Sequence, residues 1–521
     1  MQSKGAFPKR KNLDQAARSR NRREQLKPAG KKEPLHPSDK GTAPEREKFF
    51  SFLVYPVLFV FLIYPYGDYD WGWHYRYGEF LFKQGRILRE DIFSWTMQGY
   101  EWVNHSWLFD PLLYVLFNQF SFFGLSIAGA IVALLAFYFA VKPFRLSYWQ
   151  NAILAIAFGA LMSPVLDHGL RSQVVGVLLL SYFMFVLLQA REGKTWTYLA
   201  LPPLFLIWVN FHGSFLVGII LFTVFLFCDF FLLFRSRIVS IPAHWARLFA
   251  SFLASTAATF INPFTYHVYV EAVRHFRDPL LTHVLEWYPV ELTSPIGIYL
   301  LIYTCFLALA FIMRRRLSDG PLIASSLLLS YLAFRALRNI ALYVIVTLPF
   351  AALILKEVKL PVNRWKVQPW MIIAVLALVL GFAHLRRVPR FDFGMSDYCA
   401  YSSGCSERLT RYLLQNPPVG RGFNFYDWGG YLIGRGIPAK LFVDGRMHLW
   451  ERQGYRPFLE HSRIYDWEDI KRFRDYRFDW VIAQTDSPLS RTLQSSNDQL
   501  GLGRWKKMFS DERGSYFVRV Q

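Results

Sequence analysis

Two aspartates and a histidine stand in segment 67–74, directly after the first long apolar run of the chain. Asp68, Asp70 and His74 lie there among aromatic residues, where the chain leaves a bilayer. An ionisable group beside hydrocarbon is costly, so such a cluster is a candidate functional site. The alternative is an aromatic belt at the membrane surface with two solvated carboxylates. We therefore consider an aspartate of this segment as a general base.

Further polar residues stand at the ends of later apolar runs, on the same predicted side of the membrane. One such residue alone is commonly a snorkelling or capping residue. Together they indicate a cavity at the water–lipid boundary, because they come from distant parts of the chain. The candidates for binding a substrate are His74, His105, Arg171, Asn210, His212, Glu286, Arg335 and Arg338.

This set of side chains suits the transfer of a sugar from a polyprenyl phosphate. The leaving phosphate needs its charge held, which guanidinium forks and imidazole N–H groups do well. The accepting hydroxyl must lose a proton, and an aspartate can take it. A carboxylate also favours a transition state of oxocarbenium character. We predict Asp70 as the base, with Asp68 as its partner or as the alternative base.

The composition predicts a polytopic membrane protein. The chain has 521 residues, of which 53% are hydrophobic and 18% aromatic. Such values are unusual for a soluble protein, and apolar runs of spanning length recur from residue 49 to about 384. We expect about 11–13 spans. The candidates are 49–66, 106–122, 124–141, 151–166, 172–190, 196–211, 213–234, 246–262, 295–313, 321–337, 339–355 and 370–384.

Three domains follow from the change of composition along the chain. Residues 1–48 are basic and polar, which predicts a disordered cytoplasmic tail that contacts anionic lipid and binds no nucleic acid. Residues 49–385 form the transmembrane domain, with an external loop at 67–105. Residues 386–521 read as a small α/β domain. The net charge of +21 reflects membrane topology more than a polyanionic partner.

The basic loops predict the orientation in an inner (plasma) membrane. Positive charge marks the cytoplasmic side, and it gathers near Arg235 and Arg247, at 314–316 and at 356–366. The N-terminus is then cytoplasmic and the C-terminal domain extracytoplasmic. Twelve spans would instead return the C-terminus to the cytoplasm, so one element between residues 106 and 211 must be re-entrant, split or miscounted.

The C-terminal part offers strand-like runs and two cysteines. Apolar runs at 440–443, 480–483 and 516–520 predict short strands. Asp444 and Arg446 follow the first run and are predicted to form a structural ion pair. Cys399 and Cys405 are close enough in sequence to pair if this part is extracytoplasmic, and the sequence leaves the pairing open.

Two sets of segments carry a family resemblance. The first set is 70–79, 85–87, 91–96 and 101–108. It resembles the first external loop of the glycosyltransferase C (GT-C) superfamily, which includes the protein O-mannosyltransferases and the lipid A aminoarabinose transferases. The second set resembles a large bacterial branch of such proteins and consists of 208–213, 262–264, 286–287, 335–339, 426–432 and 443–446. The resemblance runs from about residue 49 to the C-terminus. It implies that an acidic residue after the first span is catalytic, and Asp70 matches this position better than Asp68.

The chain departs from both named families in the first external loop. It has Asp68-Tyr69-Asp70 where the mannosyltransferases have adjacent acids, and His105-Ser106-Trp107 where the aminoarabinose transferases end the loop with a Lys-Pro-Pro type segment. The donor sugar and the acceptor therefore do not carry over. Asp68, Asp70, His74 and His105 also offer ligands for a divalent metal, although their spacing matches no closed zinc pattern.

The sequence thus predicts a membrane glycosyltransferase that moves a sugar from a polyprenyl-phosphate donor to an extracytoplasmic glycan, lipid or protein acceptor. No cofactor is predicted, with a divalent metal as the open alternative. Two other functions stay open: a transporter or flippase of a lipid-linked sugar, and a non-catalytic membrane scaffold. A transporter often carries internal repeats, and a scaffold gives no reason for the acidic loop.

Overall fold

Long apolar helices make up most of the chain from residue 45 to residue 387. The computed structural model describes residues 45–520 except 236–241, 279, 282–283, 315, 359–367, 388–392, 403, 466–468 and 496–500. Most of the basic tail and parts of the basic loops at 235–247, 314–316 and 356–366 therefore lie outside the described residues.

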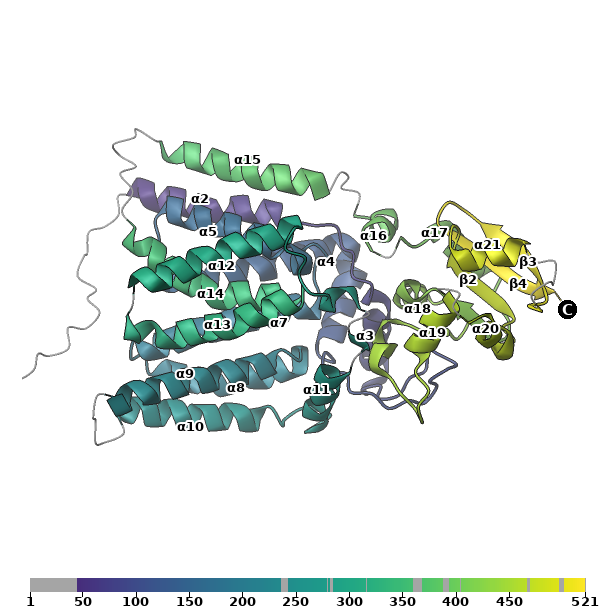
Figure 1. The fold of residues 1–521 in the computed structure, drawn as a ribbon, viewed down its shortest axis with the longest axis horizontal. Coiled ribbons are helices and arrows are strands. Elements are labelled where there is room, and N and C mark those ends of the chain that lie inside the picture. Colours follow the sequence, from purple (N-terminus) through teal and green to yellow (C-terminus); the bar gives the residue numbers. More distant parts are fainter. Residues whose placement is uncertain are drawn as a thin grey trace, which may run out of the picture. The chain divides into compact units, whose positions relative to one another are not determined.

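Five of the described helices are long and apolar enough to cross a membrane. They lie in 109–144 and in α7 (Ser172–Arg191), α9 (Phe215–Arg235), α12 (Pro295–Arg314) and α14 (Asn339–Glu357). Shorter apolar helices lie beside them in roughly the same orientation (Figure 1): α2 (Glu45–Phe61), α5 (Tyr148–Leu161), α8 (Trp196–Phe211), α10 (Ala243–Ala258), α13 (Gly320–Arg335) and α15 (Pro369–Arg387).

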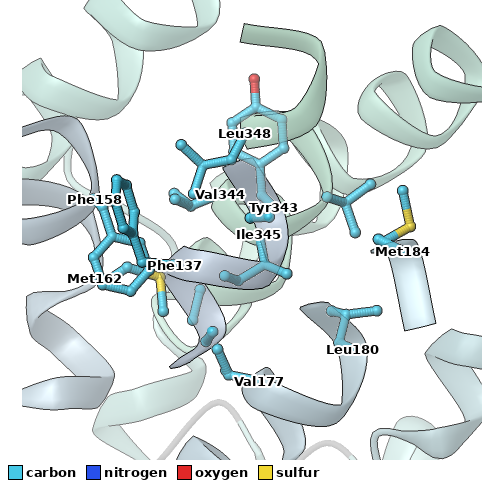
Figure 2. Close-up of a cluster of buried hydrophobic side chains, with 14 of the residues drawn as sticks. Phe137, Phe158, Met162, Val177, Leu180, Met184, Tyr343, Val344, Ile345 and Leu348 are labelled. Atoms are coloured by element: carbon cyan, nitrogen blue, oxygen red, sulfur yellow. The ribbon is translucent and has the colours of Figure 1, made fainter. Parts of the chain in front are cut away.

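Buried aliphatic and aromatic side chains from most of these helices form one core. Figure 2 shows its centre, where Phe137 and Phe158 approach Val344 and Leu348 of α14. α14 is buried over most of its length, so it forms the middle of the bundle. Interhelical packing of this kind holds the helix ends at fixed positions, and the polar site residues stand at those ends.

Helix α4 (Phe109–Val141) is kinked at Ser121, where φ is 55°. Its first half packs on α3 (Trp71–Gln84), since a Cβ on Gly78 would meet Asp110 and Tyr114 within 3 Å. Its second half packs into the helical core through Ala130, Ala133 and Phe137. The two spans predicted at 106–122 and 124–141 are therefore the two halves of one kinked helix.

The second core joins the first external loop to the C-terminal domain. It contains Trp71 and Tyr77 of α3, and Trp428, Tyr431 and Trp480 from the C-terminal part. All five side chains are less than 4% exposed. The loop and the domain therefore fold as one packed body.

A four-stranded sheet of order β1-β2-β4-β3 forms the centre of the C-terminal domain. β1 (Gly422–Asn424) pairs parallel with β2 (Trp480–Gln484), and β4 (Gly514–Val520) pairs antiparallel with β2 and with β3 (Arg504–Ser510). The described helices of this domain are α16 (Met395–Tyr401), α17 (Glu407–Gln415), α18 (Gly429–Arg435), α19 (Pro457–Tyr465), α20 (Ile470–Tyr476) and α21 (Pro488–Ser495).

Short helical pieces complete the connections. They are η1 (Lys142–Phe144), α6 (Ser163–Leu166), α11 (His267–Arg277), η3 (Leu285–Trp287), η4 (Leu317–Asp319), η5 (Tyr426–Trp428) and η6 (Gly445–Leu449). The predicted strands at 480–483 and 516–520 are present. The strand predicted at 440–443 is wrong, because Leu441 instead forms an isolated bridge with Ser94 of the external loop. Cys399 and Cys405 form a disulfide.

Candidate functional site

The two aspartates of the external loop have different surroundings. Asp68 is 1% exposed, and its Oδ1 lies 3.0 Å from Nε of Arg171. Asp70 begins α3 and is partly exposed, and its Oδ1 accepts a hydrogen bond of 2.9 Å from the indole Nε1 of Trp73. The backbone N–H of Asp70 donates to Asp68 Oδ1 at 3.3 Å. Asp68 is therefore held inside the protein, whereas Asp70 presents an oriented carboxylate that solvent reaches.

An ion-pair chain of four residues, Asp68, Arg171, Glu286 and Arg338, lies beside these aspartates. Nη1 of Arg171 is 2.8 Å from Oε1 of Glu286, and Nη1 of Arg338 is 3.8 Å from Oε2 of Glu286. Burial alone would raise the pKa of Glu286, but the two guanidinium groups hold it well below its usual value. Burial raises the pKa of Asp68, while Arg171 opposes the rise.

Residues at the ends of helices α7 and α14 and in the short helix η3 position this ion-pair chain. Arg171 precedes α7, Arg338 precedes α14, and Glu286 lies in η3 between α11 and α12. The guanidinium of Arg338 lies over the ring of Trp287, 4.6 Å from its centroid. Arg171 has both neighbouring carboxylates as partners, but Arg338 is only partly buried and keeps donors for a ligand.

The C-terminal domain closes over Asp70 through glycines. A Cβ on Gly445 would fall on Oδ1 of Asp70, and one on Gly430 would fall on the carbonyl of Tyr69. Gly72 of α3 and Gly434 of α18 touch through their backbones, so the two helices approach closely. At Gly430, Gly72 and Gly434 a Cβ would meet backbone atoms, so only a residue without a side chain fits there, whereas one at Gly445 would meet only the end of the Asp70 side chain.

Asp427 adds a third carboxylate from this domain. It precedes α18 and lies within electrostatic range of Asp70. Solvent still reaches the side chain, but the protein excludes much of the surrounding water. This desolvation raises the pKa of Asp427 to about 6, and the Asp70 carboxylate adds to the rise.

A fully buried cluster of Asp91, Asp444 and Arg446, the Arg446 cluster, fastens the domain to the external loop. Nη2 of Arg446 is 2.7 Å from Asp91 Oδ1 and 2.7 Å from Asp444 Oδ2. Nη1 donates to the hydroxyl of Tyr77 at 2.8 Å. The predicted ion pair of Asp444 and Arg446 is thus present, and it extends to the loop. Because Gly445 lies between these two residues, the cluster fixes its position against Asp70.

Four histidines surround the outer end of the ion-pair chain. The ring centroids of His105 and His212 are 6.1 Å apart, and those of His275 and His448 are 5.7 Å apart. Burial and the nearby Arg338 lower the pKa of His105 to about 4 and of His275 to about 2. Burial likewise lowers the pKa of His212 and His448. These imidazoles are neutral at pH 7 and offer N–H donors without positive charge.

Three predicted substrate-binding residues have other positions. His74 is buried, and its Nδ1 lies 2.5 Å from Oδ1 of Asp110, which also accepts from Asn104. Asn210 accepts from Trp107 Nε1 and donates to two backbone carbonyls, so its amide braces the loop. Arg335 is exposed and makes no hydrogen bond or ion pair to the site within the described residues.

The suggested metal ligands are dispersed among other partners. Asp68 contacts Arg171, Asp70 contacts Trp73, and His74 contacts Asp110. Across the part of the chain that the structure describes, no group of three or more His, Cys, Asp or Glu is arranged to hold a metal ion.

Sequence reasoning did not assign roles to Gly445, Asp427 or His448. Segment 426–432 was singled out through the GT-C resemblance, and segment 443–446 through that resemblance and the predicted ion pair of Asp444 and Arg446. The signal that could have found Asp427 is an acidic residue directly before a Trp-Gly-Gly turn. No sequence pattern could show that Asp427 lies near Asp70 in space, because the two residues are far apart in the chain and only tertiary packing brings them together.

A bundle of apolar helices, an external loop with an acidic residue at the start of a short helix, and a C-terminal domain packed on that loop define a polytopic membrane protein of the GT-C fold. Solved structures carry the same fold. The chain is similar to the crystal structure of an Archaeoglobus fulgidus oligosaccharyltransferase in the apo form, with a TM-score of 0.54 and 12% identity, over 84% of this chain and 70% of that one.

It is also similar to ArnT from Cupriavidus metallidurans. The structure of ArnT bound to undecaprenyl phosphate gives a TM-score of 0.51 with 14% identity, over 91% of this chain and 98% of ArnT. The structure of ArnT in the apo state gives a TM-score of 0.52 with 14% identity, over 91% of this chain and 97% of ArnT. At these identities the likeness concerns the fold, and it confirms the predicted GT-C fold class. The sequence matches no protein-family model and no curated protein.

Proposed function

We propose that this protein is a membrane glycosyltransferase that uses a polyprenyl-phosphate sugar, with Asp70 as the general base. The observation that carries the proposal is the contrast between the two loop aspartates. Asp68 is buried and paired with Arg171. Asp70 is accessible, oriented by Trp73, and makes no ion pair within the described residues. A base must be within reach of the acceptor hydroxyl, which favours Asp70.

In the proposed reaction the acceptor hydroxyl oxygen attacks the anomeric carbon of the sugar. Its proton passes to the Asp70 carboxylate as the new carbon–oxygen bond forms. The bond between the anomeric carbon and the phosphate oxygen breaks, and its electron pair leaves with the polyprenyl phosphate. One base on the face opposite the leaving group gives inversion of configuration.

Arg338 is the residue best suited to hold the departing phosphate. Its 3.8 Å approach to Glu286 leaves guanidinium donors for a ligand, and Trp287 fixes its plane. Arg171 then serves as the charged link between Asp68 and Glu286. The neutral imidazoles of His105 and His212 supply N–H donors nearby. The similarity to ArnT, whose structure holds undecaprenyl phosphate, supports a lipid-linked donor.

The kink of α4 supports an extracytoplasmic location of this site. When the first half of α4 belongs to the external loop, the described helices make eleven crossings. They are α2, the second half of α4, α5, α7, α8, α9, α10, α12, α13, α14 and α15. An odd number places the two ends of the chain on opposite sides. The basic N-terminal tail then lies in the cytoplasm and the C-terminal domain outside.

The test combines a gene deletion with complementation by variants. The cell's surface glycans and lipid-linked sugars are compared by mass spectrometry. We expect the deletion to accumulate one lipid-linked sugar and to lose one glycan, and Asp70→Asn to reproduce this phenotype. Glu90→Gln, a change at an exposed carboxylate of the same loop, is the matched control. Full complementation by Asp70→Asn would exclude Asp70 as the base.

A further inference from the structure

A charged cleft of about 1100 Å³ opens beside the site and has no role in the reaction described above. Its walls come from three distant segments: residues 99–101 of the external loop, helix α11 with Asp278, and residues 449–456 of the C-terminal domain. The volume is in the range of a site for an extended ligand.

The short helix η6 connects this cleft to Asp70. Its first residue, Gly445, lies against the Asp70 carboxylate, and its last residue, Leu449, lines the cleft. Between them, Nδ1 of His448 is 3.0 Å from the carbonyl oxygen of Gly445. His275 belongs to α11, which lines another side of the cleft, and it contacts the rings of His448 and Trp287. Two elements that line the cleft, η6 and α11, therefore extend from it to the site.

The cleft is lined by four arginines and by three carboxylates, those of Glu101, Asp278 and Glu451, which leaves one guanidinium group in excess. Arg456 is neutralised by Asp278 at 2.9 Å and by Glu451 at 2.6 Å. Arg274 has a side chain that is 67% exposed and only a 3.6 Å contact to Glu271. Arg277 is exposed, and Arg452 makes no ion pair within the described residues. Guanidinium forks of this kind bind carboxylates and phosphates in two-point contacts.

The aromatic wall of the cleft is rigid. Tyr100 stacks on Trp450 with centroids 4.8 Å apart, and the Arg452 guanidinium lies 5.8 Å from the Tyr100 ring. Tyr100 thus offers its ring edge and hydroxyl together with the Arg452 guanidinium, a combination of apolar and polar groups that suits a sugar. Seven of the thirteen lining residues are charged, which disfavours a lipid tail as the occupant.

We propose that this cleft binds the acceptor, and that the acceptor is an anionic saccharide. The assignment of the saccharide as the acceptor rests on the proposed transfer reaction, whereas binding of the saccharide can be measured without transfer. The saccharide would lie along Tyr100 with its acidic groups on Arg274, Arg277 and Arg452. Its reacting hydroxyl would then reach Asp70 past His448.

The test measures binding by the full-length protein in lipid nanodiscs. The probes are a galacturonate tetrasaccharide, which is anionic, and maltotetraose, which is neutral. We expect the anionic probe to bind more tightly. Arg274→Ala combined with Arg277→Ala, and separately Tyr100→Ala, should each weaken its binding by about tenfold or more. Arg411→Ala is the matched control, because Arg411 is also about two-thirds exposed and bridges a glutamate on a helix far from the cleft.

Equal binding of both probes, or equal binding by the cleft variants and Arg411→Ala, would overturn the inference. Competition by undecaprenyl phosphate in the nanodisc would also overturn it, since the cleft would then hold the donor. The measurement is repeated with Asp70→Asn. Binding that persists in this variant supports the cleft as a saccharide site even if no sugar transfer is found. The binding experiment therefore tests the cleft independently of the proposed transfer reaction.

Discussion

The change Gly445→Ala tests the placement of Asp70 more sharply than removal of the carboxylate. A Cβ at this position would lie 2.1 Å from Oδ1 of Asp70, and ordinary contact begins at 3.4 Å. The carboxylate must therefore move by about 1.3 Å, the difference between these two distances. A misplacement of about 1 Å can cost roughly 100-fold in rate, which is about 2.7 kcal/mol of transition-state stabilisation.

Stability should change little in this variant, because the displaced atom is the end of a side chain and no backbone atom need shift. Gly445 does not have a positive φ, so alanine fits its backbone conformation. Turnover is measured with the donor and acceptor that the deletion experiment identifies, and unfolding temperature is measured in parallel. Gly320→Ala is the control, since its Cβ would meet nothing within 4 Å. Wild-type turnover by Gly445→Ala would refute the placement of Asp70 as the base. A loss of turnover accompanied by a clear fall in unfolding temperature would instead indicate a folding defect.

Three further predictions follow from the C-terminal domain. Arg446→Met leaves the buried carboxylates of Asp91 and Asp444 without a cation, and we expect the free energy of unfolding to fall by about 3–5 kcal/mol. Trypsin should then cleave the domain faster, and adding Asp91→Asn and Asp444→Asn should restore much of the resistance to trypsin. Asp427 has a pKa of about 6 beside Asp70, so the pH profile of transfer should show an inflection near pH 6 that Asp427→Asn removes; an unchanged profile would contradict the coupling. Burial lowers the pKa of His461 to about 3, so the unfolded chain alone takes up this proton as pH falls below about 6.5. Stability should therefore fall between pH 6.5 and 4.5 by up to about 2.7 kcal/mol, and melting curves of His461→Gln should show a smaller fall than the wild type.

The helical part of the fold could be predicted because hydrocarbon imposes a strong pattern on sequence. Apolar runs such as those at 172–190 and 213–234 match α7 and α9 closely. The sequence predicted two spans with a break at residue 123, close to the kink at Ser121, but it did not show that the two halves are one helix. The count of twelve spans, which would have placed the C-terminus in the cytoplasm, arose because this one helix was counted as two spans.

The C-terminal sheet was only partly predictable. β2 and β4 are buried apolar strands, whereas β1 has three residues and β3 is mostly exposed, with Lys506 and Lys507 along it. The run at 440–443 has the composition of a strand, but Leu441 pairs with the external loop. Local composition cannot show which partner a short segment finds.

The site was predicted as a set of residues but not as an arrangement. The sequence favoured Asp70 over Asp68 only through the GT-C resemblance, and it could not show that Arg171, about 100 residues later, pairs with Asp68. Arg335 ends α13 and Arg338, three residues later, precedes α14, yet of these two only Arg338 meets Glu286. Such differences depend on helix ends that meet in space.

The backbone contact between Gly72 and Gly434 has a consequence for building chimeras. A soluble domain taken from a similar protein would bring a different surface to α3, and even one added methyl group at this seam would push the two helices apart. Exchange of the domain should therefore succeed only when residues 67–108 travel with it. The two segments, more than 300 residues apart in the chain, behave as a single exchangeable unit.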